Sequence, residues 1–197
     1  MRISTVILAA GNSSRFGANK LLVPLYGKPM YQYAIEKVEQ SSFYSRFIVT
    51  QYKEIMEKAG QGTVIPVRNR YPEKGISYSI RLGTESCLES DGILFLVADQ
   101  PFLSKNTIEK LKEIFSKNPS NIVCARTKKH RGNPAVFPKV FYPELLHLTG
   151  EEGGRKILEK YPEHIIYFDV ENQMELEDID TEENYRLLGT NGCTSKV

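Results

Sequence analysis

The feature that most constrains the fold is an alternation between short apolar runs and segments of helical periodicity. Six runs are rich in β-branched residues and predict strands: Ile3–Ala10, Arg46–Gln51, Thr63–Val67, Gly92–Ala98, Asn121–Ala125 and His164–Val170. Most are apolar throughout instead of alternating with polar residues. Strands of this kind suit a parallel sheet that is covered on both faces.

Five intervening or following segments predict helices: Pro29–Gln40, Ile76–Leu88, Asn106–Asn118, Gly154–Tyr161 and Thr181–Leu188. In the third of these, Ile108, Leu111, Ile114 and Phe115 fall on one stripe, as in an amphipathic helix. The alternation predicts an α/β fold, a three-layer α/β/α sandwich with a mostly parallel, Rossmann-like sheet. We expect residues 1–189 to form a single domain and residues 190–197 to be a frayed tail.

Composition narrows the class of protein. The 197 residues carry a formal net charge of +2, which gives no support to a nucleic-acid or membrane-surface partner. No apolar run approaches the roughly 20 residues that span a bilayer, and the first residues lack the pattern of a secretory signal. Three scattered cysteines without Cys-x-x-Cys spacing indicate neither a disulfide framework nor a zinc site. We therefore expect a cytoplasmic protein.

The first predicted strand is followed by a loop, Gly11–Lys20, that is rich in small and polar residues. Ligands of open α/β sheets bind at the carboxyl ends of the strands, and successive backbone N–H groups can hold an anion there. The loop matches neither the P-loop nor the Gly-x-Gly-x-x-Gly fingerprint, because Ala18 follows Gly17 and position 13 is a serine. Composition and position alone leave two interpretations open, an anion site and a flexible connection with two solvated cations.

The same loop resembles the signature loop of nucleotidyltransferases that use a nucleoside triphosphate to make a pyrophosphate-linked product. The Ala-Ala-Gly sequence is most similar to the molybdenum cofactor cytidylyltransferase branch, whereas the guanylyltransferase branch usually has Ala-Gly-Gly there. The resemblance implies a nucleotide-diphospho-sugar transferase type of fold. It also implies that Arg15 and Lys20 hold the triphosphate and act in catalysis. The nucleotide-binding residues that it implies in this loop are Leu8, Ala9, Ala10, Gly11, Ser13, Arg15, Gly17 and Lys20.

Two carboxylates are candidate magnesium ligands. Asp99 ends a buried strand, where its own sequence context equally suits a turn before Pro101. Its segment also resembles the family's second signature, in which the aspartate binds Mg²⁺. Asp180 precedes a possible helix start and could be a helix cap. The resemblance of its segment implies that it completes the metal site, with Asp178 as a supporting candidate.

The segment around the third apolar run contains candidate base-binding residues. Sequence physics favours Ser77 and Ser79 as capping residues at a helix start. Together with Asn69 and Gly75, however, they are similar to the family's base-binding segment. The resemblance therefore implies that Asn69, Gly75, Ser77 and Ser79 bind the nucleotide.

Two segments are similar to those with which the family contacts its acceptor substrate, and both depart from the family pattern. A basic run, Lys128–Arg131, has the composition of a solvated loop, and Asn133 replaces the histidine of a Gly-His-Pro segment. Glu151 replaces an aspartate in a segment that ends with Arg155. The resemblance implies that Asn133 and Arg155 contact the acceptor.

These observations predict a Mg²⁺-dependent nucleotidyltransferase that moves a nucleotidyl group, CMP from CTP, to the terminal phosphate of molybdopterin and releases pyrophosphate. A molybdoenzyme would be its client. Three alternatives stay open: transfer of a cytidylyl or guanylyl group to a sugar, alditol or isoprenoid phosphate, a non-catalytic cofactor-binding chaperone for molybdoenzymes, and a nucleotide-sensing module.

Overall fold

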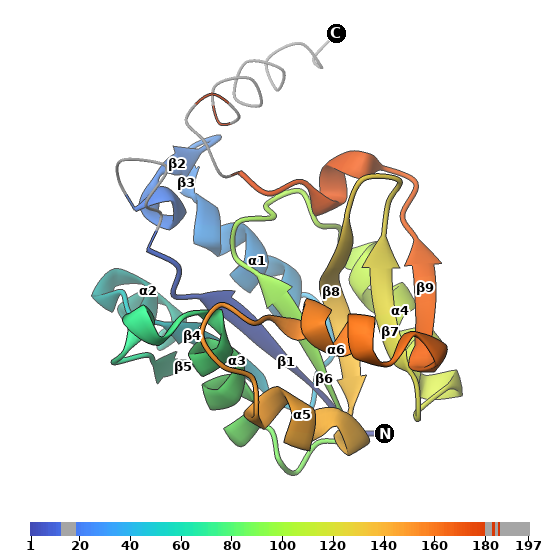
Figure 1. The fold of residues 1–197 in the computed structure, drawn as a ribbon. Helices are drawn as coiled ribbons and strands as arrows, with labels where there is room; N and C mark the ends of the chain where they lie inside the picture. The colour runs from blue at the N-terminus through green and yellow to red at the C-terminus, as the bar shows by residue number, and fades with distance from the viewer. Residues whose placement is uncertain (13–18, 180–182, 184, 186–197) are drawn as a thin grey trace, which may run out of the picture.

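The chain forms a central sheet of seven strands, seen here in a computed structural model that describes residues 1–12, 19–179, 183 and 185 (Figure 1). The strand order is β5-β4-β1-β6-β8-β7-β9. The strands are β1 (Ile3–Ala9), β4 (Arg46–Thr50), β5 (Ile65–Arg68), β6 (Gly92–Val97), β7 (Ile122–Arg126), β8 (Arg131–Pro138) and β9 (Ile165–Asp169). A small hairpin, β2 (Pro24–Leu25) with β3 (Lys28–Pro29), stands apart from this sheet.

All strand pairs of the main sheet are parallel except those of β8, which runs antiparallel to both β6 and β7. The six predicted strands are present, and the prediction of a mostly parallel sheet is confirmed. β8 was missed, because its first half, Arg131–Pro134, combines a charge, a glycine and a proline. Its second half is apolar and buried between two strands, so tertiary packing overrides the weak local preference.

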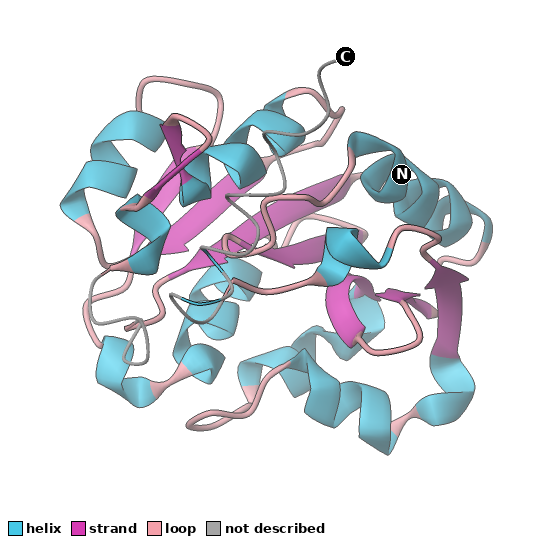
Figure 2. Cartoon of the chain, turned by 90° about the horizontal axis from the view of Figure 1, so that it is seen from above, coloured by secondary structure: helices cyan, strands magenta, loops and turns pink. Residues whose placement is uncertain are grey.

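Helices cover both faces of the sheet (Figure 2). One face packs against α1 (Met30–Glu39), α2 (Lys53–Ala59) and α4 (Lys105–Lys117), and the other against α3 (Ile76–Glu85), α5 (Tyr142–Leu146) and α6 (Gly154–Lys160). β6 shows why both faces are apolar: Leu94 and Leu96 belong to the first core cluster, and Ile93 and Phe95 to the second. The predicted three-layer α/β/α sandwich is confirmed.

The predicted helix starts and ends agree with the structure to within a few residues, but α2 and α5 were not expected. α2 has seven residues and α5 has five, and Pro143 interrupts the apolar pattern of the latter. The predicted helix Thr181–Leu188 and the tail 190–197 lie outside the described residues apart from positions 183 and 185. No helix in the described part of the chain is both long and apolar enough to cross a membrane.

Candidate active site

A cleft of about 550 Å³ opens at the carboxyl ends of β1 and β6. The chain leaves β1 toward β4 on one side and returns to β6 on the other, so this is the point where the strand order reverses. Ligands of open α/β sheets bind at such a point. The cleft is lined by Leu8, Ala9, Ala10, Gly11, Asn12, Lys20, Leu21, Pro72, Gly75, Ile76, Ser79, Val97, Asp99 and Glu151.

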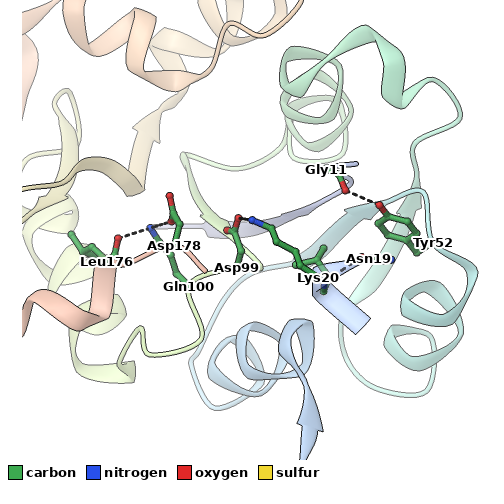
Figure 3. Close-up of polar contacts among 9 residues, drawn as sticks. Gly11, Asn19, Lys20, Tyr52, Asp99, Gln100, Leu176 and Asp178 are labelled. Atoms are coloured by element: carbon green, nitrogen blue, oxygen red, sulfur yellow. Dashed lines mark hydrogen bonds and ion pairs between the residues drawn. The ribbon is translucent and has the colours of Figure 1, made fainter. Parts of the chain in front are cut away.

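The start of the first loop is held in place by two residues that follow β4. The Gln51 side chain donates to the carbonyl of Ala10 at 2.9 Å. The Tyr52 hydroxyl donates to the carbonyl of Gly11 at 2.7 Å, as Figure 3 shows. These two hydrogen bonds fix the start of the loop at the mouth of the cleft. Gln51 and Tyr52 were not predicted as site residues, although β4 is the parallel neighbour of β1 and its carboxyl end must lie beside this loop.

Lys20 and Asp99 meet inside the cleft. Lys20 begins a short 3₁₀ helix, Lys20–Leu22, whose start is capped by the Asn19 side chain accepting from the Leu21 N–H. Lys20 Nζ lies 2.6 Å from Asp99 Oδ2, and the two side chains are only 11% and 21% exposed (Figure 3). A lysine and a carboxylate from distant parts of the sequence thus form a partly buried, charge-assisted hydrogen bond.

The segment before Asp180 is anchored beside Asp99. Gln100 Nε2 donates to Asp178 Oδ1 at 2.9 Å and to the Leu176 carbonyl at 3.2 Å (Figure 3). The backbone N–H of Ile179 donates to the carbonyl of Asp99 at 3.1 Å. Residues 176–179 therefore lie next to the cleft. Asp180 itself lies outside the described residues, so its assignment as a metal ligand stays a prediction.

The donor set suits a magnesium ion that is shared with a ligand. Mg²⁺ prefers hard oxygen donors and is usually held by one or two carboxylates together with phosphate oxygens and water. Within the described residues, no three histidine, cysteine, aspartate or glutamate side chains gather into a metal cluster. Asp99 fits a site in which phosphate oxygens and water supply further ligands.

The start of α3 is shaped by a close contact between two glycines. Gly75 has a φ of +79°, and a Cβ at this position would overlap the carbonyl oxygen of Gly150. The same carbonyl accepts the backbone N–H of Ser77 at 3.2 Å. The interpretation of Ser77 and Ser79 as helix caps is wrong, because Gly75 is the N-cap residue and no side chain caps this end. The helix begins where it does because Gly75 can adopt a positive φ, and not because a serine hydroxyl caps it.

The predicted base-binding residues do not all reach the cleft surface. Gly75 and Ser79 line the cleft, whereas Asn69 and Ser77 are not among the lining residues in the described part of the chain. All four residues are buried, and Ser77 and Ser79 are equally so, each 4% exposed. Asn69 Nδ2 donates to Ser79 Oγ at 3.0 Å, so Asn69 supports the lining from behind. The role of these four residues in nucleotide binding stays a prediction.

A second, basic groove of about 650 Å³ lies at the carboxyl ends of β7 and β9. It is lined by Arg126, Thr127, Lys128, Lys129, His130, Arg131, Arg155, Tyr167 and Asp169. Arg126 binds the Asp169 carboxylate through two hydrogen bonds of 2.6 and 3.1 Å, which lowers the pKa of Asp169 below its usual value. This groove will be called the basic groove.

The segment 150–155 connects the two hollows. Glu151, which was expected on the acceptor side, lines the first cleft, whereas Arg155, at the start of α6, lines the basic groove. Asn133 is half-buried in β8 and is not one of the residues that line either hollow in the described part of the chain. The acceptor role proposed for Asn133 and Arg155 stays a prediction.

The structure thus brings eight of the predicted site residues together in one cleft: Leu8, Ala9, Ala10, Gly11, Lys20, Gly75, Ser79 and Asp99. Ser13, Arg15 and Gly17 lie outside the described residues, like Asp180. Their parts in phosphate binding and catalysis stay predictions.

This fold, with Gly11, Lys20 and Asp99 lining a cleft at the strand-order reversal, defines the chain as an α/β protein whose ligand cleft lies at the carboxyl edge of its sheet. Residues 5–165 match the MobA-like NTP transferase domain. The chain belongs to this family and is a nucleotidyltransferase.

Two curated relatives extend the match over most of the chain. The purine catabolism protein PucB of Bacillus subtilis is 29% identical over 196 residues, covering 93% of this chain and 94% of the relative. A probable molybdenum cofactor guanylyltransferase of Thermococcus kodakarensis is 32% identical over 160 residues, covering 78% and 69%. Among solved structures, a manganese complex of Rv0371c from Mycobacterium tuberculosis has a TM-score of 0.78 at 21% identity, covering 96% and 98%. That similarity shows the fold.

Proposed function

We propose that the protein transfers CMP from CTP to the terminal phosphate of a molybdopterin-type acceptor, with Mg²⁺, and releases pyrophosphate. The observation that carries this proposal is the contact of Lys20 with Asp99 in the cleft beside the first loop. In this proposal Lys20 is the cation that binds phosphate and Asp99 is the carboxylate that binds the metal, and their contact supports the binding of one triphosphate by both. The acceptor phosphate already carries the charge of a nucleophile, so no covalent enzyme intermediate is needed.

Positioning and charge stabilisation account for catalysis in this proposal. Lys20 and Arg15 hold the triphosphate and stabilise the charge that develops on the leaving pyrophosphate. Asp99 and Asp180 hold the magnesium ion, which neutralises phosphate oxygens when it is bound. The manganese in the Rv0371c complex supports a divalent ion for this fold, and the carboxylate donors favour magnesium.

The choice of CTP rests on the first loop. Ala10 follows Ala9 where the guanylyltransferase branch usually has glycine. Both alanines are almost completely buried against the sheet and line the cleft. The relative from T. kodakarensis bears the name of a guanylyltransferase, so GTP is the second candidate donor.

The basic groove is the proposed site of the acceptor. Lys128, Lys129 and Arg131 line it, and the structure pairs none of these three with a carboxylate in the part of the chain that it describes. Unpaired cations of this kind attract a phosphorylated ligand. His130 Nε2 lies 3.2 Å from Glu177 Oε1, so the groove loop contacts the segment that also contacts Asp99.

Pyrophosphate release tests the proposal. The purified protein is incubated with Mg²⁺, molybdopterin and CTP, GTP, ATP or UTP in turn, and each reaction is repeated with sugar, alditol and isoprenoid phosphates as acceptors. We expect release with CTP and molybdopterin. Release with GTP alone would replace the donor, release with another acceptor would replace the acceptor, and molybdopterin binding without release from any nucleotide would overturn the enzymatic proposal.

A further inference from the structure

The Asn69 side chain has a fixed orientation. Its Oδ1 accepts the backbone N–H of Tyr71 at 2.9 Å, and its Nδ2 donates to Ser79 Oγ at 3.0 Å. A backbone N–H can only donate, so the atom facing Tyr71 must be the oxygen and the atom facing Ser79 must be the nitrogen. Asn69 is 2% exposed, which leaves the amide no room to exchange these partners with solvent.

This orientation determines what the Ser79 hydroxyl offers. Because Ser79 Oγ accepts from Asn69, its own proton must go to another partner. Two other hydroxyls of the same helix region donate backward to carbonyls four residues earlier: Thr84 to Ile80 at 2.8 Å and Ser86 to Leu82 at 2.9 Å. Ser79 makes no such bond among the described residues, and it lines the cleft.

We propose that Asn69 is a positioning residue that makes Ser79 a hydrogen-bond donor to an acceptor atom of the nucleotide base. The inference rests on the proposed function in one respect, that the cleft holds a nucleoside triphosphate. Asn69 acts on the base only through Ser79. A pyrimidine such as cytosine presents the required acceptors at its ring nitrogen and carbonyl oxygen.

The substitution Asn69→Asp reverses this polarity without changing the size of the side chain. The carboxylate still accepts the Tyr71 N–H, but it has no proton to donate to Ser79 Oγ. Ser79 then donates to the carboxylate and turns a lone pair toward the base. A base acceptor facing that lone pair loses its hydrogen bond.

A double-mutant cycle on CTP binding tests the proposal. The dissociation constant for CTP with Mg²⁺ is measured by calorimetry for wild type, Ser79→Ala, Asn69→Asp and the double variant. We expect Ser79→Ala to weaken binding about fivefold, the factor that corresponds to an ordinary hydrogen bond. Asn69→Asp is expected to weaken binding at least as much in wild type and to have no effect in the Ser79→Ala background. Ser86→Ala, which removes a hydroxyl from the end of the same helix, serves as the matched control.

The outcomes separate this inference from the proposed function. An equal effect of Asn69→Asp in both backgrounds, or unchanged CTP binding by Ser79→Ala, overturns the inference. Ser79→Ala is a small buried substitution, so this second arm stands even if Asn69→Asp fails to fold in a thermal unfolding scan. If the cycle gives the predicted dissociation constants but no pyrophosphate is released, the proposed function alone is overturned. If pyrophosphate is released but Ser79→Ala leaves CTP binding unchanged, the inference alone is overturned. If the wild-type protein binds GTP, ATP or UTP in place of CTP, the same cycle is measured with that nucleotide, and a wild-type protein that binds none of the four overturns the inference.

Discussion

Lys20 and Asp99 are 79 positions apart in the sequence, and their charged groups lie 2.6 Å apart in the cleft. Each neutralises the other, which lowers the cost of keeping two charges partly buried. The same contact means that an added cation competes with Lys20 for the carboxylate. An added polyphosphate competes with Asp99 for the ammonium. Metal and nucleotide binding are therefore expected to support each other.

This competition predicts how the affinity for a metal ion changes when Lys20 or Asp99 is replaced. We expect Lys20→Met to bind Mn²⁺ about 5- to 30-fold more tightly than wild type in the absence of nucleotide, since removing a competitor worth about 1–2 kcal/mol has that effect. Asp99→Asn should lose the site. Titration with Mn²⁺ followed by paramagnetic resonance measures both. Asp169→Asn, which removes a carboxylate of the basic groove, is the control and should bind like wild type.

If the basic groove binds the acceptor, a substitution there should change the KM for the acceptor and leave the KM for CTP unchanged. Arg155→Gln removes a cation from the groove but leaves the first cleft unchanged. We expect the KM for the phosphorylated acceptor to rise about tenfold while the KM for CTP stays the same, because the lost contact is a charge-assisted hydrogen bond. Steady-state kinetics with each substrate varied in turn gives both values. Equal changes in both constants, or a similar effect of Lys110→Gln on α4, would remove the groove from the acceptor site.

We expect Gly75→Ala and Gly153→Ala to differ strongly in their free energies of unfolding. Gly75→Ala combines a φ of +79° with a Cβ that overlaps the Gly150 carbonyl, and strain of this kind costs about 1–3 kcal/mol. We expect a lower free energy of unfolding and weaker nucleotide binding, because Glu151 and the helix start must move apart. At Gly153 a Cβ meets only Ile76 Cγ2 at 4.0 Å, so Gly153→Ala should change stability little. Chemical denaturation of both variants measures the contrast.

Two buried thiols in the described part of the chain predict how the stability falls at alkaline pH. Burial raises the pKa of Cys87 to about 12 and that of Cys124 to about 11, from a usual value near 9.0. Above pH 9 the unfolded chain loses these protons and the folded chain keeps them, so the free energy of unfolding falls as the pH rises toward 11. The limiting slope is about 1.4 kcal/mol per pH unit for each thiol.

Urea denaturation between pH 8 and 10.5 in the presence of a reductant measures this slope. The double variant Cys87→Ala/Cys124→Ala should show a shallower dependence. An identical slope in the variant and in wild type would assign the effect to other groups, such as Tyr142, whose pKa is also raised by burial.

The alternation of apolar runs was sufficient to predict the layers of this fold, because continuous hydrophobic strands can be buried only between two helical layers. It was also sufficient to place Lys20 and Asp99 at the same edge of the sheet. β8 could not be predicted in this way. Its burial depends on strands β6 and β7 on either side, and not on its own sequence.

The details of the site depended on contacts between distant segments. Nothing near Gly75 in the sequence indicates that Gly150 packs against it, so the local sequence alone favoured serine caps for a helix whose N-cap residue is a glycine. The same contact brings Glu151 into the first cleft, although its segment was assigned to the acceptor. The supporting position of Asn69 behind Ser79 likewise requires the three-dimensional structure, since ten residues separate them.

The central claim is that Lys20 and Asp99 act on the same reacting phosphate. Single-turnover transfer of label from α-labelled CTP to molybdopterin, in wild type, Lys20→Met, Asp99→Asn and the double variant, measures this directly. We expect each single variant to lose about 10²- to 10³-fold in rate, as for removal of one transition-state contact, and the double variant to lose less than the product of the two single losses. Lys58→Met, at an exposed lysine of α2, should transfer label like wild type. Transfer at the wild-type rate in either Lys20→Met or Asp99→Asn would contradict the claim that both residues act on the reacting phosphate.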